Sequence, residues 1–238
     1  MIFLIAALVA ILSSVYYAVS FTDDIDKVFL SISTFLFSIL TGFFISRQAS
    51  RFNKVRETVT RFDGMMSSLY RATGHIDTKL QKESGEAITA HYNRILETGQ
   101  WNIHFMEKSN TLSSLHGLLE KHVKEDSVTK LANQAIGRAL WALSGCQDAR
   151  KQMLALQHER VTAEQWVLIS FFALMLVGTA SAVPSVGDWF PSILKAAFVI
   201  SITSVLFILY RLNTLAFTER IMGEHSAKDV LGIIDGTK

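Results

Sequence analysis

The stretch that decides the fold runs from Val28 to Leu80 and reads VFLSISTFLFSILTGFFISRQASRFNKVRETVTRFDGMMSSLYRATGHIDTKL. It carries no charged side chain from Val28 to Ser46, which is long enough to cross a bilayer as a helix. Beyond this segment, apolar residues recur in alternating steps of three and four, the pattern of a heptad seam. The seam consists of Phe52, Val55, Val59, Phe62, Met66, Leu69, Thr73, Ile76 and Leu80. Because no proline interrupts it, the stretch predicts one long helix that leaves the membrane and offers its seam to partner chains.

The composition agrees with a helical membrane protein. Only two of the 238 residues are proline, and charged residues make up 18% of the chain, below the usual share of about 25%. The mean hydropathy is +0.29, which excludes a disordered or highly charged chain. A net charge of +2 gives no reason to expect nucleic acid as a partner. We therefore predict an all-α fold.

Four charge-free segments predict four transmembrane helices. They are Met1–Thr22, Val28–Ser46, Trp166–Gly187 and Ala196–Tyr210, the last extended by Ile193, Leu194 and Leu212 around a snorkelling Lys195. The alternative for the first segment is a cleaved signal peptide. It lacks the basic start of such peptides, and a short acidic loop leads directly into the second segment, so retention as a membrane helix is favoured.

The distribution of basic residues predicts the topology. The loops between spans one and two and between spans three and four are not basic, whereas arginines and lysines follow spans two and four and precede span three. The positive-inside rule then places both termini in the cytoplasm, in a plasma or inner membrane. The predicted organisation is a transmembrane hairpin (1–46), a cytoplasmic helical region (47–164), a second transmembrane hairpin (165–214) and a cytoplasmic C-terminal tail (215–238).

The middle region reads as several amphipathic helices. Gly85 and Gly99 are expected to interrupt the chain and leave a helix around 87–97. A later helix carries a stripe of small residues that permits close helix contact, comprising Val128, Leu131, Ala135, Ala139, Ala142, Cys146, Ala149, Met153 and Leu156. The sequence Thr162-Ala163-Glu164-Gln165 fits a capping box, so span three is expected to start as a new helix.

No motif indicates catalysis. The chain has no glycine-rich phosphate loop, no His-Glu-x-x-His and no serine in a nucleophile elbow. Its seven histidines are scattered, and none pair at the spacing that places two metal ligands on one helix face. Cys146 is expected to be a small buried hydrophobe. We predict no enzyme activity, no metal site and no cofactor.

Span two carries two neighbouring rows of different character. Thr34, Ser38 and Gly42 form a small row, and a bulky row of Phe35, Ile39 and Phe43 runs about 100° further around the helix. The small row allows another helix to approach closely. The bulky row faces lipid or core in the simplest interpretation. If copies of span two surround an axis instead, it forms a hydrophobic constriction that gates by dewetting.

The basic cluster after span two also has two interpretations. Arg47, Arg51 and Arg56 are ordinary topogenic charge at an inner membrane face, which is the favoured interpretation, or they surround the inner mouth of a pore.

One stretch resembles a known family. Ser38-Ile39-Leu40-Thr41-Gly42-Phe43, followed after seven residues by Arg51-Phe52 and then Arg56, is similar to the bestrophin channel family and the bestrophin-like group around it. The resemblance covers about residues 28–71. It implies that the bulky row lines a pore neck and that the chain forms a pentamer around a central ion path.

The chain also departs from the family pattern. The family's Trp-Trp pair is Phe52-Asn53 here, and its neck proline is missing. The acidic run that binds calcium in animal members is absent, because Glu219, Glu224, Asp229 and Asp235 are spread out. Calcium gating is therefore not expected.

We thus expect an oligomeric, passive ion channel whose partners are the lipid bilayer, inorganic ions and copies of itself. The alternative is a non-conducting membrane sensor or scaffold whose cytoplasmic helices bind another protein. Selectivity stays open at this stage. Asp23, Asp24 and Asp26 at the outer mouth would concentrate cations, whereas the arginines inside would attract anions.

Overall fold

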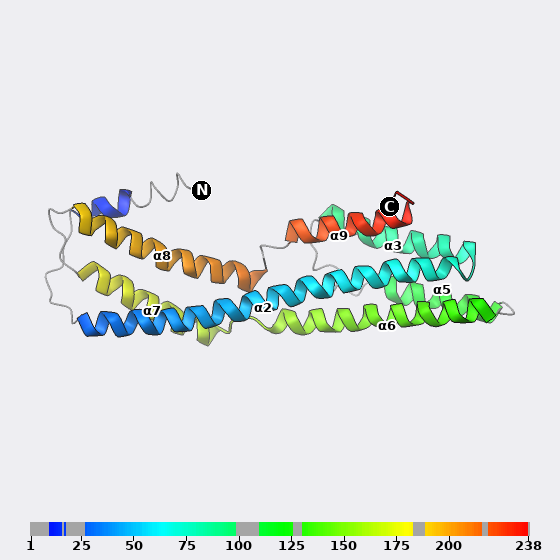
Figure 1. The fold of residues 1–238 in the computed structure, drawn as a ribbon, viewed down its shortest axis with the longest axis horizontal. Coiled ribbons are helices and arrows are strands. Elements are labelled where there is room, and N and C mark those ends of the chain that lie inside the picture. The colour runs from blue at the N-terminus through cyan, green and yellow to red at the C-terminus, as the bar shows by residue number, and fades with distance from the viewer. Residues whose placement is uncertain are drawn as a thin grey trace. The chain divides into compact units, whose positions relative to one another are not determined.

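The fold is helical in every part that the structure, a computed structural model, describes (Figure 1). These parts are residues 10–15, 17, 27–98, 110–125, 130–182, 189–215 and 219–237. The helices are α2 (Lys27–Gly74), α3 (Thr78–Thr98), α5 (Thr111–Glu125), α6 (Lys130–His158), α7 (Ala163–Ala182), α8 (Trp189–Thr214) and α9 (Glu219–Ile234). No strand occurs among the described residues, and the predicted all-α class is confirmed.

The chain divides into two compact units. The first unit contains residues 1–50 and 160–214, and the second contains residues 51–159 and 215–238. Helix α2 is 48 residues long and contributes to both units, as its uninterrupted apolar pattern predicts. The predicted division into membrane hairpins and cytoplasmic regions rests on charge, and it stays a prediction.

Three described helices are long and apolar enough to cross a membrane. They lie over Leu30–Gly74, Ala163–Ser181 and Trp189–Thr214. Most of the predicted first span falls outside the described residues, so the total of four spans stays a prediction. The predicted capping box is confirmed, since the N–H of Thr162 donates to Gln165 Oε1 at 3.1 Å and the N–H of Gln165 donates to Thr162 Oγ1 at 3.4 Å.

The core of the first unit joins α2, α7 and α8. Its buried apolar side chains are Phe37, Phe44, Val161, Ile169, Ala173, Leu176, Ile202 and Leu209. Buried Asn213 near the end of α8 accepts a hydrogen bond from the N–H of Val161 at 2.7 Å. This bond satisfies a backbone donor close to the start of α7, which would otherwise be costly to bury.

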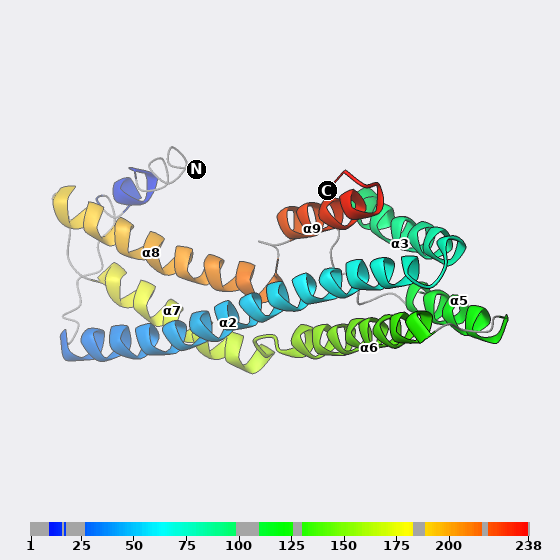
Figure 2. The ribbon, with the colours of Figure 1, turned by 45° about the vertical axis from the view of Figure 1, so that its right-hand side comes forward.

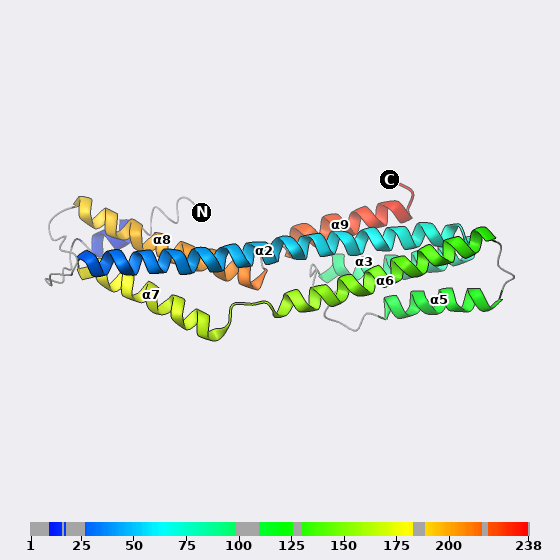
Figure 3. The ribbon, with the colours of Figure 1, turned by 60° about the horizontal axis from the view of Figure 1, so that its bottom comes forward.

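The core of the second unit is formed by the seam of α2 and the small-residue stripe of α6. Val55, Val59, Phe62, Met66 and Leu69 share one buried cluster with the α6 residues Ala139, Ala142, Cys146, Ala149 and Met153. The small side chains let the helices approach closely, because a Cβ on Gly145 would lie 3.0 Å from Met65 Sδ. Helix α9 lies along α3 (Figure 2), and α5 lies beside α6 (Figure 3).

Two expectations about α2 and α3 are wrong. The seam is not free for partner chains, because it is buried inside its own chain against the returning helices. Gly85 does not interrupt the chain either, since it lies within α3. A Cβ at this position would lie 3.1 Å from the ring of Tyr70, so the glycine serves close packing. The actual break is at Gly74, and Asp77 Oδ2 caps α3 by accepting from the N–H groups of Lys79 and Leu80.

Candidate functional site

The first half of α2 has one buried face and one exposed face. Ser33, Phe37, Thr41, Phe44 and Gln48 are buried, at steps of three and four. This periodicity leaves the opposite side of the helix outside the core of the first unit.

The predicted bulky row lies on the exposed face. Phe35, Ile39 and Phe43 are 65%, 52% and 61% exposed. These side chains are large and apolar, yet no part of the described chain covers them. On this helix they form a continuous apolar stripe.

The predicted small row lies beside it. Thr34 is half-buried, whereas Ser38 and Gly42 are exposed. The hydroxyls of Thr34 and Ser38 donate to the carbonyls of Leu30 and Thr34, each at 2.8 Å, so the helix itself satisfies them. A Cβ added at Gly42 would meet nothing within 4 Å. The small row therefore has no helix packed against its Gly42 end among the described residues.

The three arginines after this segment lie in different environments. Arg47 and Arg56 are exposed, but Arg51 is only 2% exposed. Arg51 Nε donates to the carbonyl of Leu156 at 2.6 Å, and Nη2 donates to the carbonyl of Gln157 at 3.4 Å. Both carbonyls belong to the last turn of α6, where backbone acceptors lack helical partners and the helix dipole favours a cation. Arg51 thus fastens the end of α6 to α2.

The predicted outer-mouth residues Asp23, Asp24 and Asp26 lie outside the described residues. Among the described residues, no group of three or more His, Cys, Asp or Glu side chains is placed to hold a metal ion.

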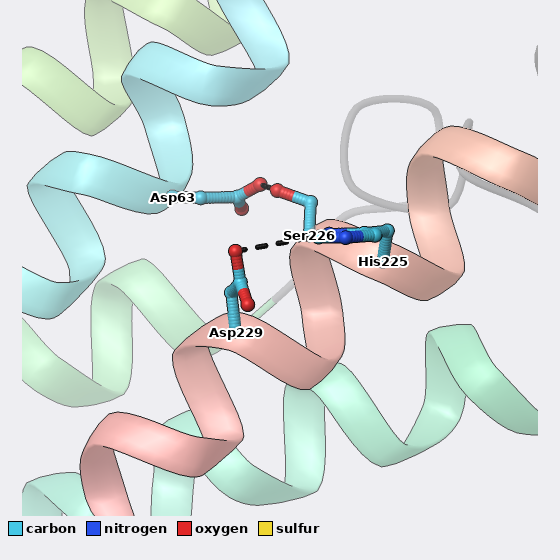
Figure 4. A network of polar contacts seen from close by, with 4 residues as sticks. All are labelled: Asp63, His225, Ser226 and Asp229. Carbon is cyan, nitrogen blue, oxygen red and sulfur yellow. Dashed lines mark hydrogen bonds and ion pairs between the residues drawn. The ribbon is translucent and has the colours of Figure 1, made fainter. Parts of the chain in front are cut away.

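The second unit contains a buried polar centre that the sequence did not indicate. Asp63 on α2 is 5% exposed. Its Oδ1 accepts from the hydroxyl of Tyr92 on α3 at 2.5 Å, and its Oδ2 accepts from the hydroxyl of Ser226 on α9. Figure 4 shows the Asp63–Ser226 contact and, on α9, the ion pair between His225 and Asp229 at 3.7 Å. One carboxylate therefore joins three helices.

Burial controls the titration of this centre. It raises the pKa of Asp63 to about 6, although the hydrogen bonds from Ser226 and Tyr92 act in the opposite direction, and the negative charge of Asp229 adds to the rise. Burial and then the charge of Asp63 raise the pKa of Tyr92. Burial, with a contribution from Asp63, raises the pKa of Cys146 to about 12. Cys146 is fully buried and holds its proton, so the expectation of a small buried hydrophobe is confirmed.

The centre was missed because its parts are far apart in the sequence. Tyr92 and Ser226 carry no local pattern that pairs them with Asp63. The available signal was the position of Asp63 next to Phe62 in the seam, where a carboxylate borders the predicted buried face.

The comparison with protein families identifies the class of this molecule. The family model of the bestrophin-like domain matches residues 2–215, which is most of the chain. The chain belongs to the bestrophin-like family, and its apolar helices make it a membrane protein. Searches of the curated proteins and of the solved structures found no match.

Proposed function

We propose that the protein is an oligomeric channel that conducts ions passively through a hydrophobic neck lined by α2. The observation that carries this proposal is the bulky row on α2 and the Ser38 and Gly42 end of the small row, which the described part of the chain leaves exposed. Family membership supports the same function.

The two rows suit two different neighbours. The small row of Ser38 and Gly42 allows a helix of an adjacent copy to approach closely. When copies associate through this row around a closed ring, the neighbouring bulky row faces the ring's axis. The resemblance implies five copies. In this assembly each chain has a transmembrane hairpin on either side of a cytoplasmic helical region, and both termini lie in the cytoplasm.

The bulky row supplies the gate. A narrow ring of Phe35, Ile39 and Phe43 side chains resists wetting, so ions meet a barrier although no charge blocks them. The exposed Arg47 and Arg56 are suited to attract anions at the inner mouth. Arg51 is left out of the proposed mouth because it is committed to the end of α6. Asp23, Asp24 and Asp26 are the outer-mouth residues of the proposal.

The test uses a triple variant with Phe35→Ala, Ile39→Ala and Phe43→Ala, recorded in planar bilayers. Smaller side chains widen the neck and ease wetting, so conductance or open probability should rise above that of the parent. A matched control is Val167→Ala, Phe171→Ala and Leu174→Ala on α7, which are also large, apolar and exposed. The control should conduct like the parent.

Two outcomes would count against the proposal. A neck variant that assembles normally and conducts like the parent would remove the assignment of the bulky row. No current from the correctly assembled parent would remove conduction itself and favour a membrane scaffold or sensor.

A further inference from the structure

The second unit has a groove between α2 and α6 whose lining is basic and polar. Its volume is about 630 Å³, and Ile233 of α9 also lines it. Its polar lining consists of Ser67, Ser68 and Arg71 from α2, of His75 directly after the end of α2, and of Gln134 and Arg138 from α6. Arg71 lies on the same face of α2 as Ser67 and Ser68, because it follows them by four and three positions, and Gln134 and Arg138 are four positions apart on α6.

The charge of this groove is of one sign. Two arginines line it from facing helices, and none of the described residues that line it is a carboxylate. Arg71 and Arg138 are exposed, and the described part of the chain offers neither of them a hydrogen bond or an ion pair. By contrast, a second groove of about 570 Å³ along α3 contains both Lys82 and Glu86, whose charges offset each other. The α2–α6 groove is therefore suited to an anion.

The donor set indicates which anion. Guanidinium groups match the oxygens of a phosphoryl group in a bidentate arrangement, and hydroxyl and amide groups add further donors. The hydroxyl of Ser67 already donates to the carbonyl of Asp63 at 3.0 Å, which leaves Ser68 and Gln134 as the neutral donors. A volume of this size accommodates a small organic molecule rather than a single halide ion.

We propose that the α2–α6 groove binds a small phosphate-bearing anion, with Arg71 and Arg138 holding the phosphoryl oxygens. Binding there bridges α2 and α6, the two helices that form most of the core of the second unit. The phosphoryl group belongs either to a soluble compound or to a phosphorylated lipid headgroup. Both share the chemistry that the groove recognises.

The test measures binding of inorganic tripolyphosphate to the full-length protein by titration calorimetry, at constant ionic strength. Replacing Arg71 and Arg138 with Gln should weaken binding at least about tenfold, because two charge-assisted contacts are lost. The matched control replaces Arg61 and Lys151 with Gln. These residues are exposed, lie on the same two helices and carry the same charge, so the control should bind within about twofold of the parent.

A third variant tests the groove with a single exposed substitution, which should leave the fold intact. Gln134→Glu changes one exposed side chain and places a carboxylate in the groove, so it should also weaken tripolyphosphate binding. The proposal is overturned if the double-Gln variant binds like the parent. It is equally overturned if the Arg61 and Lys151 control loses as much affinity, because binding would then follow net charge alone.

Two lipid arms separate the sources of the phosphoryl group. The same titration is made in nanodiscs of phosphatidylcholine alone and in nanodiscs that also contain phosphatidylinositol bisphosphate. Equal affinity in the two arms identifies a soluble compound. If tripolyphosphate binds more weakly in the nanodiscs with phosphatidylinositol bisphosphate, and this difference between the nanodiscs disappears in the double-Gln variant, the groove is occupied by a lipid headgroup.

Discussion

At the scale of single residues, Asp63 and His91 are buried ionisable groups whose effects on stability oppose each other. The pKa of Asp63 is raised from 3.8 to about 6, chiefly by burial. Between these pH values Asp63 therefore keeps its proton in the folded protein and has lost it in the unfolded chain. The stability that this proton contributes decreases as the pH rises through that range. His91, which is 7% exposed, has a pKa lowered from 6.5 to about 4 by burial and by the charge of Arg94. Its contribution is present above pH 6.5 and is lost as the pH falls towards 4.

Substituting Asp63 or His91 should therefore change the pH dependence of the unfolding free energy in opposite directions. Relative to the parent, Asp63→Asn should gain about 2 kcal/mol of unfolding free energy as the pH rises from 4 to 6, because one pKa unit corresponds to about 1.4 kcal/mol and part of the difference develops outside this range. His91→Asn should show the opposite trend between pH 4 and 6.5, since it removes a group that disfavours folding in acid. Chemical unfolding at closely spaced pH values measures both differences. Parallel profiles for parent and variants would contradict the buried positions of these groups.

At the scale of elements, the two halves of α2 have different roles. In the second unit the seam of α2 is buried against other helices of the same chain, and Arg51 holds the last turn of α6 against α2. In the first unit the opposite side of α2 is exposed, and none of the described residues covers it. Association with another copy is therefore expected to use the Ser38 and Gly42 row, and the Val59 and Phe62 seam is excluded because it is already buried.

This assignment predicts that Gly42→Leu disrupts the oligomer. A Cβ at Gly42 meets nothing within 4 Å in one chain, so the larger side chain is compatible with the folded protomer and blocks only a neighbouring helix. Gly178→Leu on α7 is the matched control, because a Cβ there also meets nothing within 4 Å. Native mass spectrometry in detergent should show a smaller species for the first variant and an intact closed oligomer for the second. Intact oligomers for both would place the interface elsewhere.

At the scale of the whole molecule, the predicted topology can be tested with introduced cysteines. The native Cys146 is fully buried, so it should give little background labelling. Ser84 is an unsuitable reporter for the cytoplasmic region, because it is buried and hydrogen-bonded to Thr73 at 2.9 Å. Glu86 is exposed and serves instead.

Cysteines at Asp24 and Asp188 should react with an impermeant maleimide added outside intact cells, and cysteines at Glu86 and Lys238 should not. This follows from the excess of arginine and lysine around the proposed cytoplasmic segments. Lysed cells should label at Glu86, which controls for its accessibility. External labelling at Glu86 in intact cells would reverse the orientation.

The sequence by itself determined the features that depend on neighbouring residues along the chain. Two prolines and long apolar segments indicated helices that can cross a membrane, Thr162 and Gln165 indicated the start of α7, and the alanine stripe of α6 indicated close packing. The bulky and small rows of α2 were also readable, because helical periodicity alone places each row on its own face.

Only the tertiary structure decided which partner each face meets. A heptad seam is the same pattern whether it packs on another chain or on its own, so the burial of Val59 and Phe62 within one chain was not predictable. Arg51 reaches carbonyls more than a hundred positions away, and Asp63 gathers Tyr92 and Ser226 from α3 and α9. Such contacts depend on how distant helices return to α2. Local propensity and periodicity carry no information about that return, because its energy comes from long-range burial and hydrogen bonding.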